Sequence, residues 1–430
     1  MYKKCSALKQ WVITSLLVMA ITFLWGSQMA WSRTKIIYWA WDLQADLAVK
    51  LEKPFEEKYP DIDLEIVKMG IWNVHDKLSV VLAAGTGAPD VSQLTLRRFT
   101  DFSVTGELLD LTDRFRKYEG KFVAPSWEGV KYKGRLYALP ITSTPGIIYY
   151  RKDILDQFNI KPEDLKTWDS IIRIGKNITD EKAGRYMTFL SSPAEAYAAD
   201  PWVMYITSMG GNVFDEQGNL IRNNKTAEKA FKFWYDLVYT HKIAKLEPFG
   251  RPAFWSFVKS NNLVMFPWSV PILGTLKTQV PEQSGKWRAL AWPMLPGQSA
   301  PQVGDFGGTV LTVPKQTKNV DAVITWMEYL CTSMEGTKGT YQQTGSLPAY
   351  KPALEASFMK EPDPYLGGQV RIDIVNSQKA FPFNYFHWTE GSSIIGSQLD
   401  AMLARQKTPE QAWQDAENLL YSKVKGETKK

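Results

Sequence analysis

Residues 133–153, with the sequence KGRLYALPITSTPGIIYYRKD, limit the possible folds more than any other stretch of this chain. The first part is typical of a strand that runs into Pro140, and the last part of a second, apolar strand that ends near Asp153. Between them lies an uncharged run with several hydroxyl groups, closed by Pro145 and Gly146. Proline lacks a backbone donor and fixes φ, and glycine accepts angles that other residues avoid, so one continuous strand cannot form here. The pattern predicts a chain that crosses between two lobes, with its hydroxyl groups facing the gap.

Strand and helix patterns alternate before this crossing. The chain has 430 residues, which is long for one hydrophobic core, so two domains are expected. Alternation of strands with helices indicates βα units and a mainly parallel sheet. The expected strands lie at 35–41, 62–66 and 91–96, and the expected helices at 43–59 and 73–84.

Two glycine-containing interruptions later in the chain, at 304–308 and 344–348, are similar to the first crossing and predict two more. We therefore expect an α/β protein of two lobes, each a mainly parallel sheet flanked by helices, joined by two or three crossover strands near 142–146, 304–308 and 344–348. The expected bounds are 33–142 with 308–345 for the N-terminal lobe, and 146–304 with 348–430 for the C-terminal lobe.

The first 32 residues are typical of a secretory signal peptide. Lys3, Lys4 and Lys9 precede an apolar run at 11–25, and the sequence Ala-Trp-Ser that ends at Ser32 suits a cleavage site. The apolar run is short for a membrane span, which needs about 20 residues. An uncleaved anchor is the alternative interpretation.

The cysteines and the net charge limit which compartment and which partners are possible for this chain. Cys5 lies before the apolar run, so it cannot be a lipid-modified cysteine, and cleavage leaves only Cys331, which cannot form an internal disulfide. After cleavage 48 basic residues face 45 acidic ones, too small an excess to indicate a nucleic-acid partner. We expect an exported, periplasmic protein without a lipid anchor and without a nucleic-acid partner.

Several short motifs together resemble the bacterial extracellular solute-binding proteins of the carbohydrate type, a maltose-binding-protein-like family. Each motif is weak alone, but their order and spacing behind a signal peptide are specific. The motifs lie at 55–60 (FEEKYP), 85–91 (GTGAPDV), 106–109 (GELL), 134–153, 166–169 (KTWD), 265–268 (MFPW), 307–308 (GG) and 345–348 (GSLP).

This resemblance implies a type II periplasmic-binding-protein fold, in which two lobes close over a ligand held in the cleft between them. It implies capture of a mono- or oligosaccharide and its delivery to the permease subunits of an ABC importer by a monomer, without catalysis, cofactor or metal. The composition agrees, because 14 of the 17 tryptophans lie after residue 32. Sugar rings stack on flat aromatic side chains, and their hydroxyl groups need polar partners.

The candidate ligand-binding residues of the first lobe follow its strands, because α/β sheets place ligands beyond the carboxyl ends of the strands. Trp39, Trp41 and Asp42 end the first strand, and Thr95 and Arg98 follow the third. The alternatives are core packing for the two tryptophans, a helix-capping role for Asp42 and a solvated position for Arg98.

Four more candidates lie at the crossings themselves. Ser143 and Thr144 belong to the first crossing, and Asp305 and Gly307 to the second. These residues are expected to act in the hinge and also to contact the ligand.

The second lobe supplies three tryptophans as candidates. Trp202 is expected with Asp200 on a loop before a helix, Trp268 follows a short strand expected at 262–266, and Trp388 belongs to an aromatic cluster. The resemblance makes Trp268 the best stacking platform, whereas Trp388 has lobe-core packing as an equal alternative.

The sequence gives little support to an enzymatic function. The three histidines, His75, His241 and His387, lie on separate elements, and no zinc, nucleophile-elbow or phosphate-loop motif occurs. Two alternatives stay open: the same fold with a non-sugar solute, and an exported glycosidase or lyase that would use Asp42 and Asp305.

Overall fold

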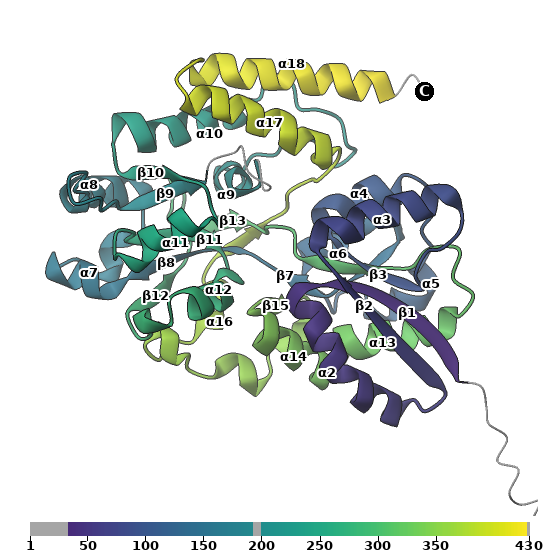
Figure 1. Cartoon of the computed structure of the whole chain (residues 1–430). Helices are drawn as coiled ribbons and strands as arrows, with labels where there is room; N and C mark the ends of the chain where they lie inside the picture. The colour runs from purple at the N-terminus through teal and green to yellow at the C-terminus, as the bar shows by residue number, and fades with distance from the viewer. Residues whose placement is uncertain (1–32, 192–198, 428–430) are drawn as a thin grey trace, which may run out of the picture.

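The computed structural model describes residues 33–191 and 199–427. These residues form two lobes that lie side by side, with the crossing segments between them (Figure 1). The predicted signal peptide lies outside the described residues. Among the residues described, no helix combines the length and the apolar character that a membrane crossing requires.

The N-terminal lobe is built on a five-stranded sheet with the order β2-β1-β3-β14-β6. β1 pairs in parallel with β2 and β3, whereas β14 is antiparallel to both of its neighbours. The strands are β1 (Thr34–Trp41), β2 (Ile62–Met69), β3 (Val91–Thr95), β6 (Ala138–Pro140) and β14 (Thr309–Thr312). The main helices are α2 (Asp42–Lys58), α3 (Ile71–Ala84), α4 (Leu96–Ser103), α13 (Val320–Thr332) and α14 (Met334–Thr344).

The C-terminal lobe also has one antiparallel strand among strands that share a direction, and here that strand is β8. β8 lies between β11 and β12 and is antiparallel to both, while β9 pairs in parallel with β10 and lies against the start of β11. The strands are β8 (Gly146–Arg151), β9 (Thr188–Ser191), β10 (Ala244–Glu247), β11 (Met265–Ser269) and β12 (Trp287–Leu290). The helices include α7 (Lys152–Gln157), α8 (Trp168–Ile178), α9 (Asp200–Ser208), α10 (Lys225–Tyr235), α11 (Pro252–Lys259), α12 (Ile272–Gln279), α16 (Arg371–Asn376), α17 (Trp388–Leu403) and α18 (Pro409–Glu427).

In each lobe the antiparallel strand is the one that enters from the other lobe. β14 follows the second crossing and β8 follows the first. The other strands of each lobe's main sheet share one direction, so their carboxyl ends meet at one edge of that sheet.

Local sequence signals explain where several helices begin and end. Gly85 ends α3 in the left-handed conformation, with φ of 69°. Thr167 caps α8 by accepting a hydrogen bond from the Ser170 amide, and Thr408 and Gln411 form a capping box before α18.

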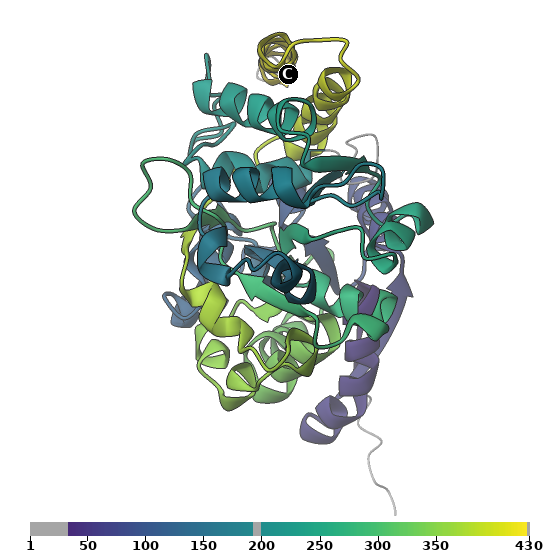
Figure 2. The same cartoon turned by 90° about the vertical axis from the view of Figure 1, so that its left-hand side faces the viewer.

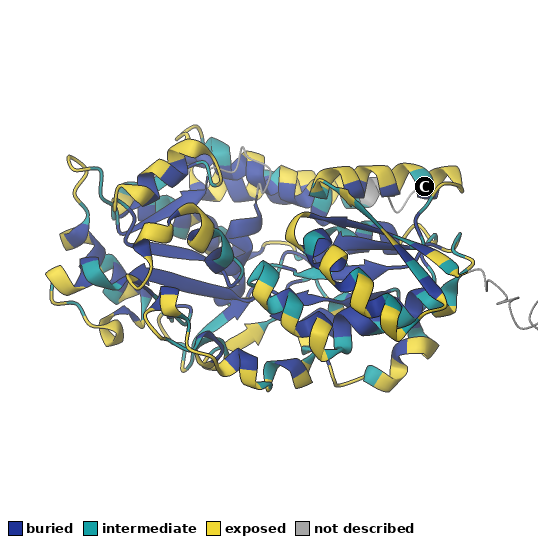
Figure 3. Cartoon of the chain, turned by 60° about the horizontal axis from the view of Figure 1, so that its bottom comes forward, coloured by how far each residue is buried: buried dark blue, intermediate teal, exposed yellow. Residues whose placement is uncertain are grey.

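Three clusters of buried side chains form the hydrophobic cores, and each cluster belongs mainly to one lobe. One fills the N-terminal lobe, and the other two lie on opposite faces of the C-terminal sheet. The neighbours Tyr149 and Tyr150 of β8 point into different clusters, as alternation along a strand requires. Figure 3 shows the buried strands inside a layer of partly exposed helices. In Figure 2 the two yellow C-terminal helices, α17 and α18, lie together on the outside of their lobe.

Candidate ligand site between the lobes

Three crossing segments meet between the lobes and are hydrogen-bonded to one another. The first contains β7 (Thr142–Ser143), which pairs with β15 (Leu347–Pro348) of the third. Pro145, in the first, forms a bridge with Asp305 of the second. The crossing read from residues 133–153 is therefore one part of a three-segment joint, as expected from the two later interruptions.

The Asp305 carboxylate is the centre of this joint. It accepts hydrogen bonds from the hydroxyl of Ser143 at 2.5 Å, the hydroxyl of Thr144 at 2.8 Å, and the amides of Thr144 and Gly307, each at 2.9 Å to Oδ1. All three side chains are buried. Their polar groups bind each other, so the structure gives Ser143, Thr144 and Asp305 a hinge role and leaves contact with the ligand as a prediction only.

Two glycines allow the second crossing to pass close to the first. Gly307 and Gly308 have φ of 107° and 60°, a region that side chains disfavour. A Cβ atom on Gly308 would lie 2.2 Å from the Thr142 carbonyl oxygen. Gly307 thus acts through its backbone, as an amide donor to Asp305 and as a point of close approach.

The carboxyl ends of strands from both lobes supply the side chains around the gap. β3 ends at Thr95, directly before α4, and β11 carries Trp268 near its end. In the C-terminal lobe, α9 begins at Asp200, after the segment that follows β9. In open α/β sheets this edge is where ligands bind.

An ion pair joins the two lobes at this edge. Arg97 of α4 contacts the carboxylate of Asp200 of α9, and the side chains are only 10% and 8% exposed. The indole of Trp388 donates to the other oxygen of Asp200 at 2.7 Å. Burial is the main cause that raises the pKa of Asp200, and the Arg97 charge opposes it.

Aromatic rings continue from this ion pair into the C-terminal lobe. The Arg97 guanidinium lies 5.0 Å from the ring centre of Phe306, which lies 5.5 Å from that of Trp268. Trp268 in turn stacks on Phe249 at 4.2 Å. Trp268 is 5% exposed, so the aromatic wall formed by Phe306, Trp268 and Phe249 is covered by its neighbours.

On the N-terminal side a buried histidine organises the strand ends. His75 Nδ1 bonds the Ile71 carbonyl at 2.8 Å, and Nε2 accepts the Thr95 amide at 3.2 Å. Its ring packs against Trp41 at 5.3 Å and against the partly exposed Trp72 at 6.0 Å. This pattern requires the neutral ring with its proton on Nδ1, so His75 positions Thr95 and Trp41.

We expect His75 to make the fold acid-sensitive. Burial, followed by the nearby Arg98 charge, lowers the pKa of His75 from 6.5 to about 3. Because the unfolded chain then binds more protons below pH 6.5, neutral His75 stabilises the fold above that pH, and this stability is lost as the pH falls towards 3. The slope is at most about 1.4 kcal/mol per pH unit. Urea unfolding at about pH 7.5 and about pH 5 checks this.

The matched variant is His75→Gln, which cannot titrate in this range. The other groups titrate alike in both proteins, so the difference between the two free energies of unfolding isolates His75. The difference should shrink as the pH falls, and a difference that stays constant would contradict the prediction.

The structure covers two of the tryptophans predicted to bind the ligand. Trp202 is fully buried in α9, packed against Phe231 and Trp413, and belongs to the lobe core. It is therefore corrected to a structural residue. Trp39 lies under α3, where the Lys77 ammonium is 4.6 Å from its ring centre, but it is 5% exposed, as Trp268 is, so its contact with a ligand stays a prediction.

The other predicted residues lie near the gap with defined partners. Arg98 lies 3.5 Å from Asp101, on the same turn of α4. Asp42 follows β1 as the first residue of α2, where it is exposed and has a φ of 45°, and the N-cap residue of α2 is Trp41. Trp388 is buried in the lobe core, the alternative given from sequence, and donates a hydrogen bond to Asp200, while its contact with a ligand stays a prediction.

Sequence reasoning placed Arg97 after the third strand and Phe306 at the second crossing, but it missed the pairing of Arg97 with Asp200 and the role of His75. Arg97 and Asp200 are 103 positions apart, and no local pattern signals their pairing. His75 stands on the inner face of a helix pattern, where it reads as an ordinary buried side chain. The predicted strand at 262–266 ended before Pro267, because a proline usually interrupts a strand. In the structure β11 continues through Pro267 to Ser269, since β11 is the edge strand of its sheet and needs no amide donor at this position.

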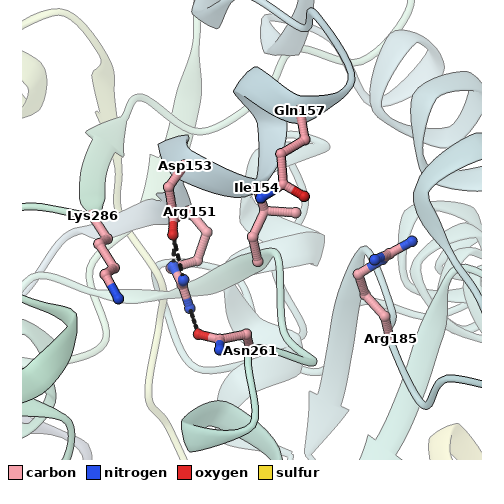
Figure 4. A pocket seen from close by; sticks show the side chains of 7 residues that line it. All are labelled: Arg151, Asp153, Ile154, Gln157, Arg185, Asn261 and Lys286. Carbon is pink, nitrogen blue, oxygen red and sulfur yellow. Dashed lines mark hydrogen bonds and ion pairs between the residues drawn. The ribbon is translucent and has the colours of Figure 1, made fainter.

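A separate cavity lies at the other end of β8, away from the crossings. It has a volume of about 180 Å³ and is lined by Arg151, Asp153, Ile154, Gln157, Arg185, Asn261 and Lys286 (Figure 4). Arg151 is held by Asp153 at 2.8 and 2.6 Å and by Asn261 at 2.7 Å. No aromatic ring is among these described lining residues, so the cavity lacks the stacking surface found between the lobes.

Comparisons with known proteins agree on one class. A family model described as bacterial extracellular solute-binding protein matches residues 50–363. An arabinooligosaccharide-binding protein of Bacillus subtilis is 25% identical over 408 residues, which are 91% of this chain and 92% of that protein. A second one, from Halalkalibacterium halodurans, is 27% identical over 303 residues, 69% of this chain and 67% of that protein.

Solved structures give the same result for the fold. The maltose-bound MalE3 of T. maritima is 25% identical, with a TM-score of 0.72 over 90% of this chain and 99% of that one. A binding protein from B. animalis subsp. lactis, in complex with β-1,6-galactobiose, is 24% identical, with a TM-score of 0.75 over 92% and 98% of the two chains. These similarities confirm the predicted two-lobed α/β fold.

Proposed function

Because this chain belongs to the bacterial extracellular solute-binding protein family, we propose that it captures a mono- or oligosaccharide between its lobes and delivers it to an ABC importer by lobe closure. Membership in this family confirms the prediction of a binding protein that carries out no catalysis. The relatives named for arabinooligosaccharides, lactose and maltodextrin support a sugar as the solute.

The observation that carries this proposal is the contact of Arg97 with Asp200 and with Phe306, which packs on Trp268. Arg97 lies in α4, directly after β3 of the N-terminal lobe, whereas Asp200 and Trp268 belong to the C-terminal lobe, so these groups approach one another only where the lobes meet. A ligand that contacts both lobes binds best when they are closed, so binding shifts the population towards the closed form. Guanidinium and carboxylate groups suit sugar hydroxyls, and the rings suit sugar C–H faces.

The wider setting follows from the same proposal. The permease subunits of an ABC importer are the expected partners of the closed form, and the protein acts as a monomer in the periplasm. The sequence before residue 33 supports export, and the position of Cys5 supports a protein without a lipid anchor.

An exported glycosidase is the weaker candidate. It would need two carboxylates that are free to act on one glycosidic bond. Asp305, one of the two proposed from sequence, already accepts hydrogen bonds from Ser143, Thr144 and Gly307 in the joint.

A thermal-shift screen of the mature protein tests the function directly. The panel contains arabinotriose, lactose, maltotriose and galactobiose, with spermidine and glycerophosphocholine as non-sugar solutes. A ligand at about 100 times its dissociation constant should add about 2.7 kcal/mol to the free energy of unfolding. A shift with at least one sugar, without release of a product, is expected. A shift with only a non-sugar solute, or hydrolysis of the sugar, would contradict the proposal.

A further inference from the structure

The charges beside the aromatic wall are balanced within the protein. We propose that the Arg97–Asp200 pair restricts the site to uncharged ligands with adjacent hydroxyl groups, and that it excludes sugars bearing carboxylate or phosphate groups. This inference rests on the proposed function, which says that the ligand is a sugar but not whether it is charged.

The Arg97–Asp200 pair lies in a buried environment. Both side chains are nine-tenths buried, and they come from opposite lobes. Asp200 also accepts hydrogen bonds from the indole of Trp388 at 2.7 Å and from the Ser392 hydroxyl at 3.5 Å. These donors are neutral, so Arg97 supplies the positive charge that balances the buried carboxylate.

The neighbouring groups add no net positive charge to the pair. Arg98 lies 3.5 Å from Asp101, which also accepts a hydrogen bond from Thr389 of the other lobe. His75 is uncharged at neutral pH, because its buried ring has a pKa of about 3. The two arginines of α4 thus face two carboxylates, and this pairing provides no net positive charge for an anionic ligand.

A buried pair of opposite charges can bind neutral hydroxyl groups and repel an anion. A sugar hydroxyl can donate to the Asp200 carboxylate, while its neighbour on the ring accepts from the Arg97 guanidinium. An anionic group bound at Arg97 would instead lie beside the Asp200 carboxylate in a site that excludes water, where repulsion between like charges is strong. Rejection by an unfavourable charge is a common basis of specificity.

Isothermal titration of the mature protein with matched ligand pairs tests this inference. The pairs are galactose with galacturonate and glucose with glucuronate, in which the acid keeps the sugar ring and differs only in the oxidation of C6 to a carboxylate. We expect the neutral member of a bound pair to bind at least about 100-fold more tightly than its acid. In Asp200→Asn, which keeps an acceptor for Trp388, this ratio should fall at least about tenfold, because the carboxylate charge that repels an anion beside Arg97 is then absent.

Two further variants control for folding and for general charge effects. The double variant Arg97→Gln with Asp200→Asn leaves no buried charge unpaired, so it keeps the test possible if Asp200→Asn does not fold. It should bind neutral and acidic members within about tenfold of each other. Asp153→Asn breaks the Arg151–Asp153 pair at the distant cavity and should leave the ratio unchanged.

The outcomes separate this inference from the proposed function. Equal or tighter binding of an acidic member by the wild type, or an unchanged ratio in Asp200→Asn, would overturn the charge selectivity while the sugar-binding function stands. Binding of no sugar, neutral or acidic, would overturn the proposed function and the selectivity with it.

Discussion

Asp305→Ala is expected to lower the free energy of unfolding by about 3–5 kcal/mol. The change leaves the hydroxyls of Ser143 and Thr144 and the amides of Thr144 and Gly307 without their acceptor in a buried joint. Each buried donor that loses its partner costs about 1–3 kcal/mol, and water that enters the joint recovers part of this. Urea unfolding of the purified variant measures the effect.

Two control variants define the cause. Asp305→Asn keeps the shape and one acceptor oxygen, so its loss should be smaller than that of Asp305→Ala. Asp321→Ala removes a carboxylate that is 84% exposed and pairs with Arg114, and it should change stability by less than about 0.5 kcal/mol. A loss at Asp305 no larger than at Asp321 would contradict the central role of this carboxylate.

Trp268→Ala is expected to weaken ligand binding by about 2–4 kcal/mol, or roughly 30- to 1000-fold. The ring lies between Phe249 and Phe306, next to the Arg97 guanidinium, and supplies the flat surface on which a sugar ring would stack. Its removal also opens a cavity, so stability should fall by about 3–5 kcal/mol. Titration calorimetry with the sugar found in the screen measures binding at a temperature where the variant is folded.

Comparison with Trp202 separates binding from stability. Trp202→Ala removes a fully buried ring from the lobe core and should cause a similar loss of stability, but it should bind the same sugar within about threefold of the wild type. Trp268→Phe keeps a stacking face and should retain most of the affinity. An equal loss of affinity in Trp202→Ala and Trp268→Ala would show that Trp268 acts through stability alone.

The crossing at 133–153 could be predicted from sequence because proline and glycine act locally. The strand to Pro140, the polar joint and the strand from Gly146 all occur in the structure. The capping signals at Thr167 and Thr408 were equally readable. Helix and strand patterns on both sides of the joint then led to the two-lobed fold.

The site could be predicted only in part, because its central contacts join distant segments. Ser143 and Asp305 are 162 positions apart, and both were named, but their bond to each other was not foreseeable. Whether a tryptophan on a strand or helix faces the gap depends on the packing of neighbouring elements. Trp202 and Trp39 show this, since both are covered by side chains from elsewhere in the chain.

The position of β14 has a consequence for how the chain acquires its shape during synthesis. This strand lies between β3 and β6, and the Thr312 hydroxyl bonds the Ser92 carbonyl across 220 positions of sequence. The N-terminal sheet therefore stays incomplete until residues 309–312 have left the ribosome, and β3 and β6 each keep an unpaired edge until then. Such high contact order favours slow folding, so we expect the N-terminal sheet to close only after most of the chain has been synthesised.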